Sequence, residues 1–166
     1  MQEQTVILNK KQIEHKIKRI AYQIYETNVT EHEVVIAGIK NNGFTLAKKL
    51  KAAVEEISPI QATLCEVSIN KKKPTDPIET SIPEQEYTNK SLVLVDDVLH
   101  SGTTLIYGVK HFLEVPLKQF KTAVLVDRNH KKYPIKADFK GISLSTSLNE
   151  NVAVIFEKGN DRAILE

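Results

Sequence analysis

Hydrophobic residues recur along this chain at two spacings, which predict alternating helices and strands. In the segment KKQIEHKIKRIAYQIYE, residues 10–26, isoleucines recur every three or four positions, as on one buried face of a helix. Asn9 stands just before this segment and is a suitable N-cap. HEVVIAGI and SLVLV are instead continuous apolar runs, typical of strands buried on both faces. The expected helices are 10–26, 41–57 and 103–114, and the expected strands are 32–39, 60–69, 92–95, 120–126 and 152–157.

The order of these elements predicts the fold class. Buried strands separated by helices indicate an α/β fold with a central, mostly parallel sheet flanked by helices. In such folds, ligands bind at the carboxyl ends of the strands. Three polar clusters follow strands, at residues 38–43, 96–104 and 127–130, and the topology predicts that they converge. Residues 71–88 show no apolar period and are expected to form a long loop.

Composition narrows the class of protein. With 166 residues, 41% of them hydrophobic, the chain suits a single domain, 1–166, with its own core. One cysteine, Cys65, excludes an internal disulfide and a zinc site built from several cysteines. The sequence shows neither a signal-peptide pattern nor an apolar stretch of membrane-spanning length, so we expect a cytoplasmic protein with no membrane partner. A net charge of +2 provides no overall field that demands nucleic acid.

The most informative stretch is SLVLVDDVLHSGTTL, residues 91–105. Asp96 and Asp97 follow its apolar run, and two adjacent carboxylates at the end of a buried strand need compensation. Gly102 lets a ligand approach the backbone, and the hydroxyl and N–H groups around it begin a helix, which attracts phosphate. The aspartates suit neutral hydroxyls or a divalent cation. A ligand with a phosphate at one end, vicinal hydroxyls in the middle and a magnesium-bound group beyond would fit these residues, and 5-phosphoribosyl pyrophosphate is one such ligand.

VLVDDVLHSGTTL resembles the phosphoribosyl pyrophosphate motif of type I phosphoribosyltransferases, in which apolar residues, an acid pair and a Ser/Thr-Gly turn occur in this order. The competing P-loop interpretation fails because the Gly-Lys-Ser/Thr ending is missing. Most of the chain, above all residues 125–141 (LVDRNHKKYPIKADFKG), resembles the pyrimidine-operon attenuator family, whose members are also uracil phosphoribosyltransferases. The resemblance implies the type I phosphoribosyltransferase fold, with a small hood or flexible loop at about residues 69–89.

The resemblance also implies a role for each matching position. The ribose hydroxyls and the 5-phosphate are expected at Asp96, Asp97, His100, Ser101, Gly102, Thr103 and Thr104, with Mg²⁺ as the cofactor held by Asp96 and Asp97. Pyrophosphate is expected at Gly38, Ile39, Lys40, Asn41 and Lys72. The base is expected at Val126, Asp127, Arg128 and Phe139, although a place in the core is the more common one for an isolated phenylalanine. The lysine run 71–73 either clamps pyrophosphate in a hood that excludes water or forms a plain solvated loop.

His100 occupies the variable position of the motif and, with Asp97, is a candidate catalytic residue. Purine-salvage relatives place there an aspartate suspected of proton transfer, whereas the attenuator family typically places an aromatic residue. Because histidine is planar and titrates near neutrality, we expect His100 to lie against the nucleobase and to act as general base. The alternative is that His100 belongs to the phosphate-binding turn but points to solvent.

Two positions depart from the attenuator family. Asn42 and Thr103 stand where that family usually carries arginines. An amide or a hydroxyl offers hydrogen bonds to phosphate but no charge, so weaker binding of phosphoribosyl pyrophosphate is expected unless Lys40 and the lysine run substitute.

Three functions compete. The first is transfer of phosphoribose to a nucleobase, with uracil as the expected acceptor. The second changes the acceptor to hypoxanthine or guanine. The third is a nucleotide-sensing, RNA-binding regulator of pyrimidine genes, which would use basic residues of the first helix, namely Lys11, Lys16, Lys18 and Arg19. The resemblance also implies a homodimer or a larger homo-oligomer.

Overall fold

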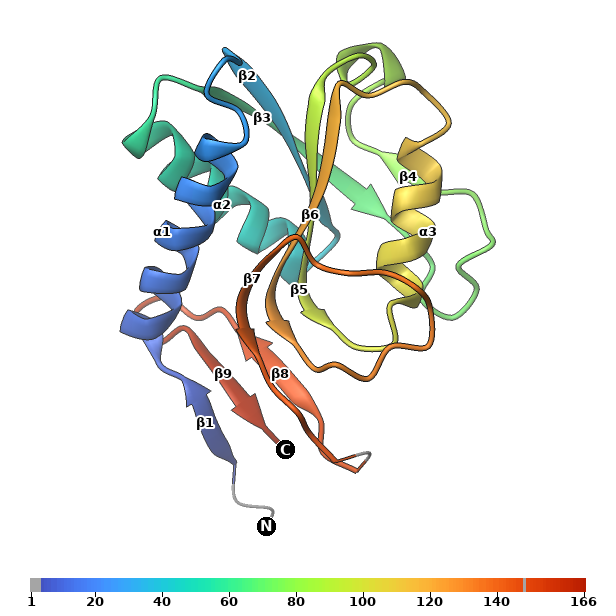
Figure 1. Cartoon of the computed structure of the whole chain (residues 1–166). Helices are drawn as coiled ribbons and strands as arrows, with labels where there is room; N and C mark the ends of the chain where they lie inside the picture. The colour runs from blue at the N-terminus through green and yellow to red at the C-terminus, as the bar shows by residue number, and fades with distance from the viewer. Residues whose placement is uncertain (1–3, 148) are drawn as a thin grey trace.

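The structure is a computed structural model that describes residues 4–147 and 149–166. Its strands form two sheets, a six-stranded sheet of order β4-β3-β2-β5-β6-β7 and a three-stranded sheet of order β1-β9-β8 (Figure 1). The elements are β1 (Thr5–Leu8), α1 (Lys10–Glu26), β2 (Glu33–Ile39), α2 (Asn42–Ile57), β3 (Gln61–Ser68), β4 (Glu79–Thr80), the 3-10 helix η1 (Glu84–Glu86), β5 (Ser91–Leu99), α3 (Thr103–Phe112), β6 (Gln119–Asp127), β7 (Phe139–Ser143), β8 (Val152–Ile155) and β9 (Arg162–Leu165).

The large sheet confirms the predicted α/β fold. β2 pairs in parallel with β3 and β5, and β5, β6 and β7 continue the parallel order, while the short β4 is antiparallel at the edge. Helices α1 and α2 cover one face of this sheet and α3 covers the other (Figure 1). Each face therefore has its own hydrophobic core, and the carboxyl ends of the parallel strands meet at one edge.

Helix α1 forms where the apolar spacing predicted it. The side chain of Asn9 accepts a hydrogen bond from the Gln12 N–H, and the Asn9 N–H donates to Gln12 Oε1, both at 2.9 Å. This reciprocal capping box satisfies two backbone groups that a helix start leaves without partners. The buried stripe comprises Ile13, Ile17, Ile20, Ala21 and Ile24.

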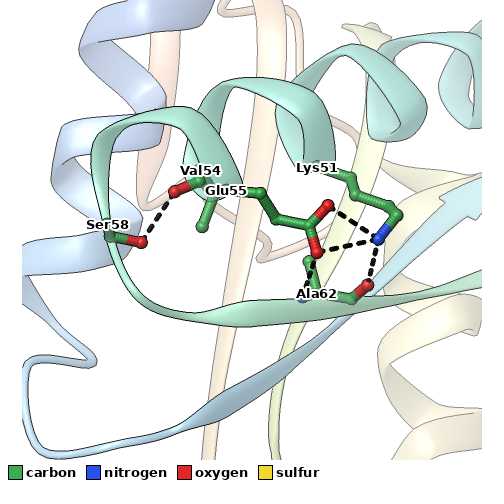
Figure 2. Close-up of polar contacts among 5 residues, drawn as sticks. All are labelled: Lys51, Val54, Glu55, Ser58 and Ala62. Atoms are coloured by element: carbon green, nitrogen blue, oxygen red, sulfur yellow. Dashed lines mark hydrogen bonds and ion pairs between the residues drawn. The ribbon is translucent and has the colours of Figure 1, made fainter.

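The turn between α2 and β3 is held by a compact polar cluster (Figure 2). Lys51 Nζ donates to both Glu55 oxygens at 2.9 Å and to the Ala62 carbonyl at 2.7 Å, and the Ala62 N–H donates to Glu55 Oε2 at 3.1 Å. Ser58 Oγ donates to the Val54 carbonyl at 2.7 Å, which satisfies a carbonyl of the last turn of α2. The hydrogen bond from Lys51 lowers the pKa of Glu55. The cluster thereby ties the end of α2 to the first residues of β3.

The structure differs from the expected elements in several places, and it includes two strands, β1 and β7, where the sequence predicted none. β5 continues past Val95 to Leu99, because Asp96 and Val98 keep their places opposite β6. The expected last strand, 152–157, is followed by β9, which pairs with β8 and β1. Residues expected to be a free loop or hood include β4 and η1, and Tyr87 is buried in the core beneath α3.

Within the described residues, no helix has the length and apolar character needed to cross a membrane.

Candidate functional site

A pocket opens at the carboxyl end of β5. Its wall continues from β5 through the turn at residues 100–102 to the first turn of α3. Lys71, from the segment after β3, completes the lining. The predicted ribose and phosphate residues all line this pocket: Asp96, Asp97, His100, Ser101, Gly102, Thr103 and Thr104.

The acid pair lies inside the β5 strand rather than beyond it. Asp96 is buried, and its Oδ1 accepts a hydrogen bond from the Asp97 N–H at 2.9 Å. Burial, together with the neighbouring Asp97 carboxylate, raises the pKa of Asp96 well above its ordinary value, and the charge of Lys71 opposes the shift. The folded protein therefore holds a carboxyl group whose ionised form needs positive charge that the chain supplies only in part.

Asp96 and Asp97 suit a Mg²⁺ ion that is also bound by phosphate oxygens of a ligand. Among residues 4–147 and 149–166, no three acidic, histidine or cysteine side chains gather into a complete metal site. Mg²⁺ is commonly bound through one or two carboxylates, with water and substrate phosphate oxygens as the other ligands. Asp96 and Asp97 fit that pattern, and a cation beside them would relieve the unfavourable charge on Asp96.

The turn after β5 forms a cradle for an anion. Gly102 adopts φ 86°, in the left-handed region, and α3 begins at the next residue. Ser101 Oγ lies 2.8 Å from Thr103 Oγ1 and accepts from the Thr103 N–H at 3.3 Å, so the two hydroxyls are held together at the helix start. The first-turn N–H groups of a helix have no intrahelical partner, and they carry the positive end of the helix dipole. A phosphate group fits this position.

The segment after β6 is fastened to the cradle. The Ser101 carbonyl accepts from the Lys132 N–H at 2.7 Å and from the Tyr133 N–H at 3.2 Å, and the Arg128 N–H donates to the Leu99 carbonyl at 3.1 Å. These backbone bonds bring the expected base-binding segment beside the expected phosphate site, as the topology predicts.

His100 and Arg128 meet directly. Arg128 Nη1 lies 3.0 Å from His100 Nδ1, and both side chains are largely shielded from solvent. Burial and the adjacent guanidinium lower the pKa of His100, with Asp97 acting in the opposite direction. The Nδ1 lone pair is engaged by Arg128, which is a poor arrangement for the general base that the sequence suggested.

The other residues expected to bind the base lie deeper. Val126 and Phe139 are buried in the core between the sheet and helices α1 and α2. Asp127 is also buried, and it accepts from the Asn129 N–H at 2.9 Å, with Lys131 and Lys140 within 4 Å of its other oxygen. The structure does not bring Phe139 to the pocket: it begins β7 opposite Ala123, where its ring fills the core instead of stacking on a base.

The expected pyrophosphate turn joins β2 to α2. Gly38 is required by packing, because a Cβ there would lie 2.6 Å from both the Gly43 carbonyl oxygen and the Phe44 Cα. Ile39 is buried, Lys40 is exposed, and Asn41 has φ 75°, which is uncommon for a residue other than glycine. The turn therefore presents its backbone and the exposed side chain of Lys40, and Gly43, just after it, packs closely against Asp96. Lys72, expected with this group, is exposed, and the lysine that lines the pocket is its neighbour Lys71.

Asn42 has a role that sequence spacing does not reveal. Its Nδ2 donates to Asp97 Oδ2 at 3.2 Å and to the Val154 carbonyl at 2.7 Å. The amide thus links the acid pair on β5 to β8 in the small sheet. The only signal in the sequence was that an amide stands where the attenuator family carries an arginine.

Comparison with known proteins identifies relatives over most of the chain. The family described as "Phosphoribosyl transferase domain" matches residues 3–156. "Bifunctional protein PyrR" of Geobacter sulfurreducens is 36% identical over 169 residues, which cover 96% of this chain and 95% of the relative. "Bifunctional protein PyrR" of Bacillus subtilis is 33% identical over 164 residues, which cover 93% and 91%.

Solved structures share the fold at lower identity. The hypoxanthine phosphoribosyltransferase of Trypanosoma cruzi superimposes with a TM-score of 0.79 at 15% identity, covering 96% of this chain and 95% of the other. A hypoxanthine-guanine phosphoribosyltransferase from Bacillus anthracis gives a TM-score of 0.74 at 22% identity, covering 89% and 85%. At these identities the likeness supports the fold rather than the choice of base.

Proposed function

The chain belongs to the phosphoribosyltransferase family, as its motifs predicted, and on this premise we propose that it transfers the 5-phosphoribosyl group of phosphoribosyl pyrophosphate to uracil and releases pyrophosphate. The observation that carries the proposal is one pocket in which an acid pair and the start of α3 lie side by side. The helix start suits the 5-phosphate, and the carboxylates suit the ribose hydroxyls, since a carboxylate accepts hydrogen bonds and repels phosphate.

The reaction asks the site to stabilise charge and to position two reactants. The bond between the anomeric carbon and the pyrophosphate oxygen breaks, and its electron pair leaves with pyrophosphate. A ring nitrogen of the base bonds to that carbon and gives its proton to solvent. Lys71 and Lys40 supply positive charge on the pyrophosphate side, while the cradle holds the far end of the ribose phosphate.

Mg²⁺ belongs to the proposal as the partner of Asp96 and Asp97. When bound, it would neutralise part of the charge on the acid pair and on the departing pyrophosphate. Asn42 holds Asp97 in place for this purpose through its hydrogen bond from α2.

Uracil is proposed over a purine because the relatives that align over nearly the whole chain are the PyrR proteins, and the family that the sequence resembles acts on uracil. A pyrophosphate-release assay with Mg²⁺ and a panel of uracil, cytosine, hypoxanthine and guanine tests this choice. Release with uracil alone is the expected result. Release with hypoxanthine or guanine in place of uracil would assign the protein to the purine group, and no release with any base would remove the catalytic proposal.

A second candidate function is binding of RNA by the same protein. The relatives are called bifunctional, and Lys11, His15 and Lys18 are exposed on one side of α1. Arg19 contributes less to this surface, because its guanidinium donates to the carbonyls of Lys140 and Gly141 at 2.7 and 2.6 Å. Binding of a pyrimidine-operon leader RNA that weakens as salt is added would support the role. Affinity that does not change with salt would contradict it.

Assembly into a homodimer or a larger homo-oligomer completes the proposal. Sedimentation velocity of the purified chain tests it, and a single monomeric species across micromolar concentrations would overturn it.

A further inference from the structure

Arg128 is held from three sides. It is buried, and its Nε donates to Thr146 Oγ1 at 3.0 Å, while Nη2 donates to the Glu150 carbonyl at 2.6 Å. A longer bond of 3.4 Å joins Nη2 to the Ser147 carbonyl. These contacts leave Nη1 in a fixed position, where it meets His100 Nδ1 at 3.0 Å. The segment before β8 therefore orients the guanidinium.

The contact decides which nitrogen of His100 carries the proton. An arginine guanidinium has hydrogen-bond donors and no acceptor, so the atom that it meets must supply a lone pair. His100 Nδ1 is then unprotonated, and the neutral ring must carry its proton on Nε2. A second proton on Nδ1 would set two cations against each other at hydrogen-bond distance.

The surroundings favour the same neutral form. Burial and Arg128 lower the pKa of His100, Asp97 opposes them, and Lys71 adds a smaller effect in the lowering direction. The ring lines the pocket with the cradle residues. Because Nδ1 is engaged, Nε2 is the ring nitrogen available to a bound molecule.

We propose that His100 is a fixed hydrogen-bond donor that presents Nε2–H to a carbonyl oxygen of the nucleobase, and that Arg128 is the positioning residue that sets this tautomer. This inference rests on the proposed function, since it names the group of the acceptor that the site recognises. It replaces the role of general base with one of recognition: the ring offers a proton to share and no free lone pair to take one up. A base that presents a carbonyl oxygen at this place satisfies the donor, whereas a base that presents an amino group or a C–H leaves it without a partner.

The first experiment measures the tautomer without catalysis. Long-range ¹H–¹⁵N correlation spectra of histidine-labelled protein distinguish the two neutral tautomers, and His100→Gln assigns the signal. We expect the Nε2–H form in the wild-type protein, a mixture of forms in Arg128→Met, and a change at Nε2–H when uridine 5′-monophosphate is added. An Nδ1–H ring in the wild-type protein would overturn the proposal whether or not the protein is active. If Arg128→Met does not fold, the wild-type spectrum still decides.

The second experiment uses kinetics. His100→Gln places an amide N–H near the position of Nε2, whereas His100→Leu keeps bulk and removes the donor. We expect kcat/KM with uracil to fall about tenfold in His100→Leu, as for loss of one hydrogen bond, and to fall much less in His100→Gln. His32→Gln, at the opposite end of the sheet from the pocket, is the matched control for the substitution itself.

The pH dependence of kcat/KM distinguishes a hydrogen-bond donor at His100 from a general base. A fixed donor predicts that the acidic limb of kcat/KM is the same in the wild-type protein and in His100→Gln. Loss of that limb in His100→Gln, or equal damage by Gln and Leu, would overturn the proposal. Absence of pyrophosphate release with every base would instead overturn the proposed function and leave the tautomer measurement to stand by itself.

Discussion

Gly102→Ala tests how closely the cradle is packed against the segment that follows β6. The added methyl group would lie well inside van der Waals contact of Ile135 Cγ2, and the residue would have to keep φ 86°. A left-handed conformation costs a residue with a Cβ about 1–2 kcal/mol. Overpacking costs about 1–3 kcal/mol more. The free energy of unfolding should therefore fall by roughly 2–5 kcal/mol, and binding of phosphoribosyl pyrophosphate should weaken as the cradle shifts.

Urea denaturation of a double-mutant cycle separates the two costs. Ile135→Ala removes Cγ2, so in combination with Gly102→Ala it should recover the overpacking part, with a coupling energy of about 1–3 kcal/mol. Ile135→Val is the matched control, because it shortens the side chain and keeps the clashing methyl group. A coupling energy near zero for Ile135→Ala, or an equal recovery by Ile135→Val, would refute the assigned clash.

Three further predictions concern the acid pair, the α2–β3 turn and the pocket lysine. Asp96→Asn should raise the free energy of unfolding at pH 7 by about 1–2 kcal/mol while it abolishes pyrophosphate release, because it removes a buried charge. The folded-state pKa of Asp96 is raised, so the wild-type protein loses stability as pH rises through that pKa. The unfolding temperature of Asp96→Asn should therefore exceed that of the wild type by less at lower pH, and a difference that stays constant would contradict this. Glu55→Gln should cost less than about 1 kcal/mol at pH 7, since the pair with Lys51 is partly exposed. The lowered pKa of Glu55 makes this stabilisation fade as pH falls through the folded-state value, so urea unfolding that shows a constant deficit down to acidic pH would count against it. Lys71→Ala should raise KM for phosphoribosyl pyrophosphate about tenfold, as for loss of one charged contact, and Lys72→Ala should change KM little. If steady-state kinetics show the larger effect for Lys72→Ala, Lys72 is the lysine that contacts pyrophosphate, as the sequence suggested.

Local patterns were sufficient to predict the three helices and four strands of the large sheet, β2, β3, β5 and β6, but not its outer strands β4 and β7. The strands β2, β5 and β6 contain continuous apolar runs, β3 alternates, and α1 has a clear apolar stripe. The short β4 and the mixed sequence of β7 carry neither signal. The sequence did not predict the strands β1 and β9, because each has four residues and pairs with a strand at the other end of the chain. β5 was expected to stop before Asp96 because carboxylates usually mark a strand end, yet the backbone pairing continues beyond the acid pair.

The candidate site likewise combines residues that are close in sequence, which could be predicted, with contacts between distant segments, which could not. The acid pair and the cradle are contiguous in sequence, so one motif was enough to predict that they share a pocket. The contacts that tune the pocket join separate segments: Arg128 reaches His100 across 28 positions, and Asn42 reaches Asp97 across 55. No spacing rule reveals such pairs. For Phe139 the sequence left a base-stacking and a core position open, because its place beside a motif says nothing about which face of β7 its ring occupies, and the structure shows the core position.

The small sheet has a consequence for how the pocket is assembled. Thr5 pairs with Leu165, so this sheet closes only when residues from opposite ends of the described chain meet, and such non-local pairing is slow to form. The large sheet has no such requirement and should be complete first. Because Asn42 donates both to Val154 in the small sheet and to Asp97, every local opening of β8 and β9 also frees the acid pair from one of its restraints. We therefore expect the ligand site to be fully restrained only when the small sheet is closed, and amide exchange in β8 and β9 should report how often that restraint is released.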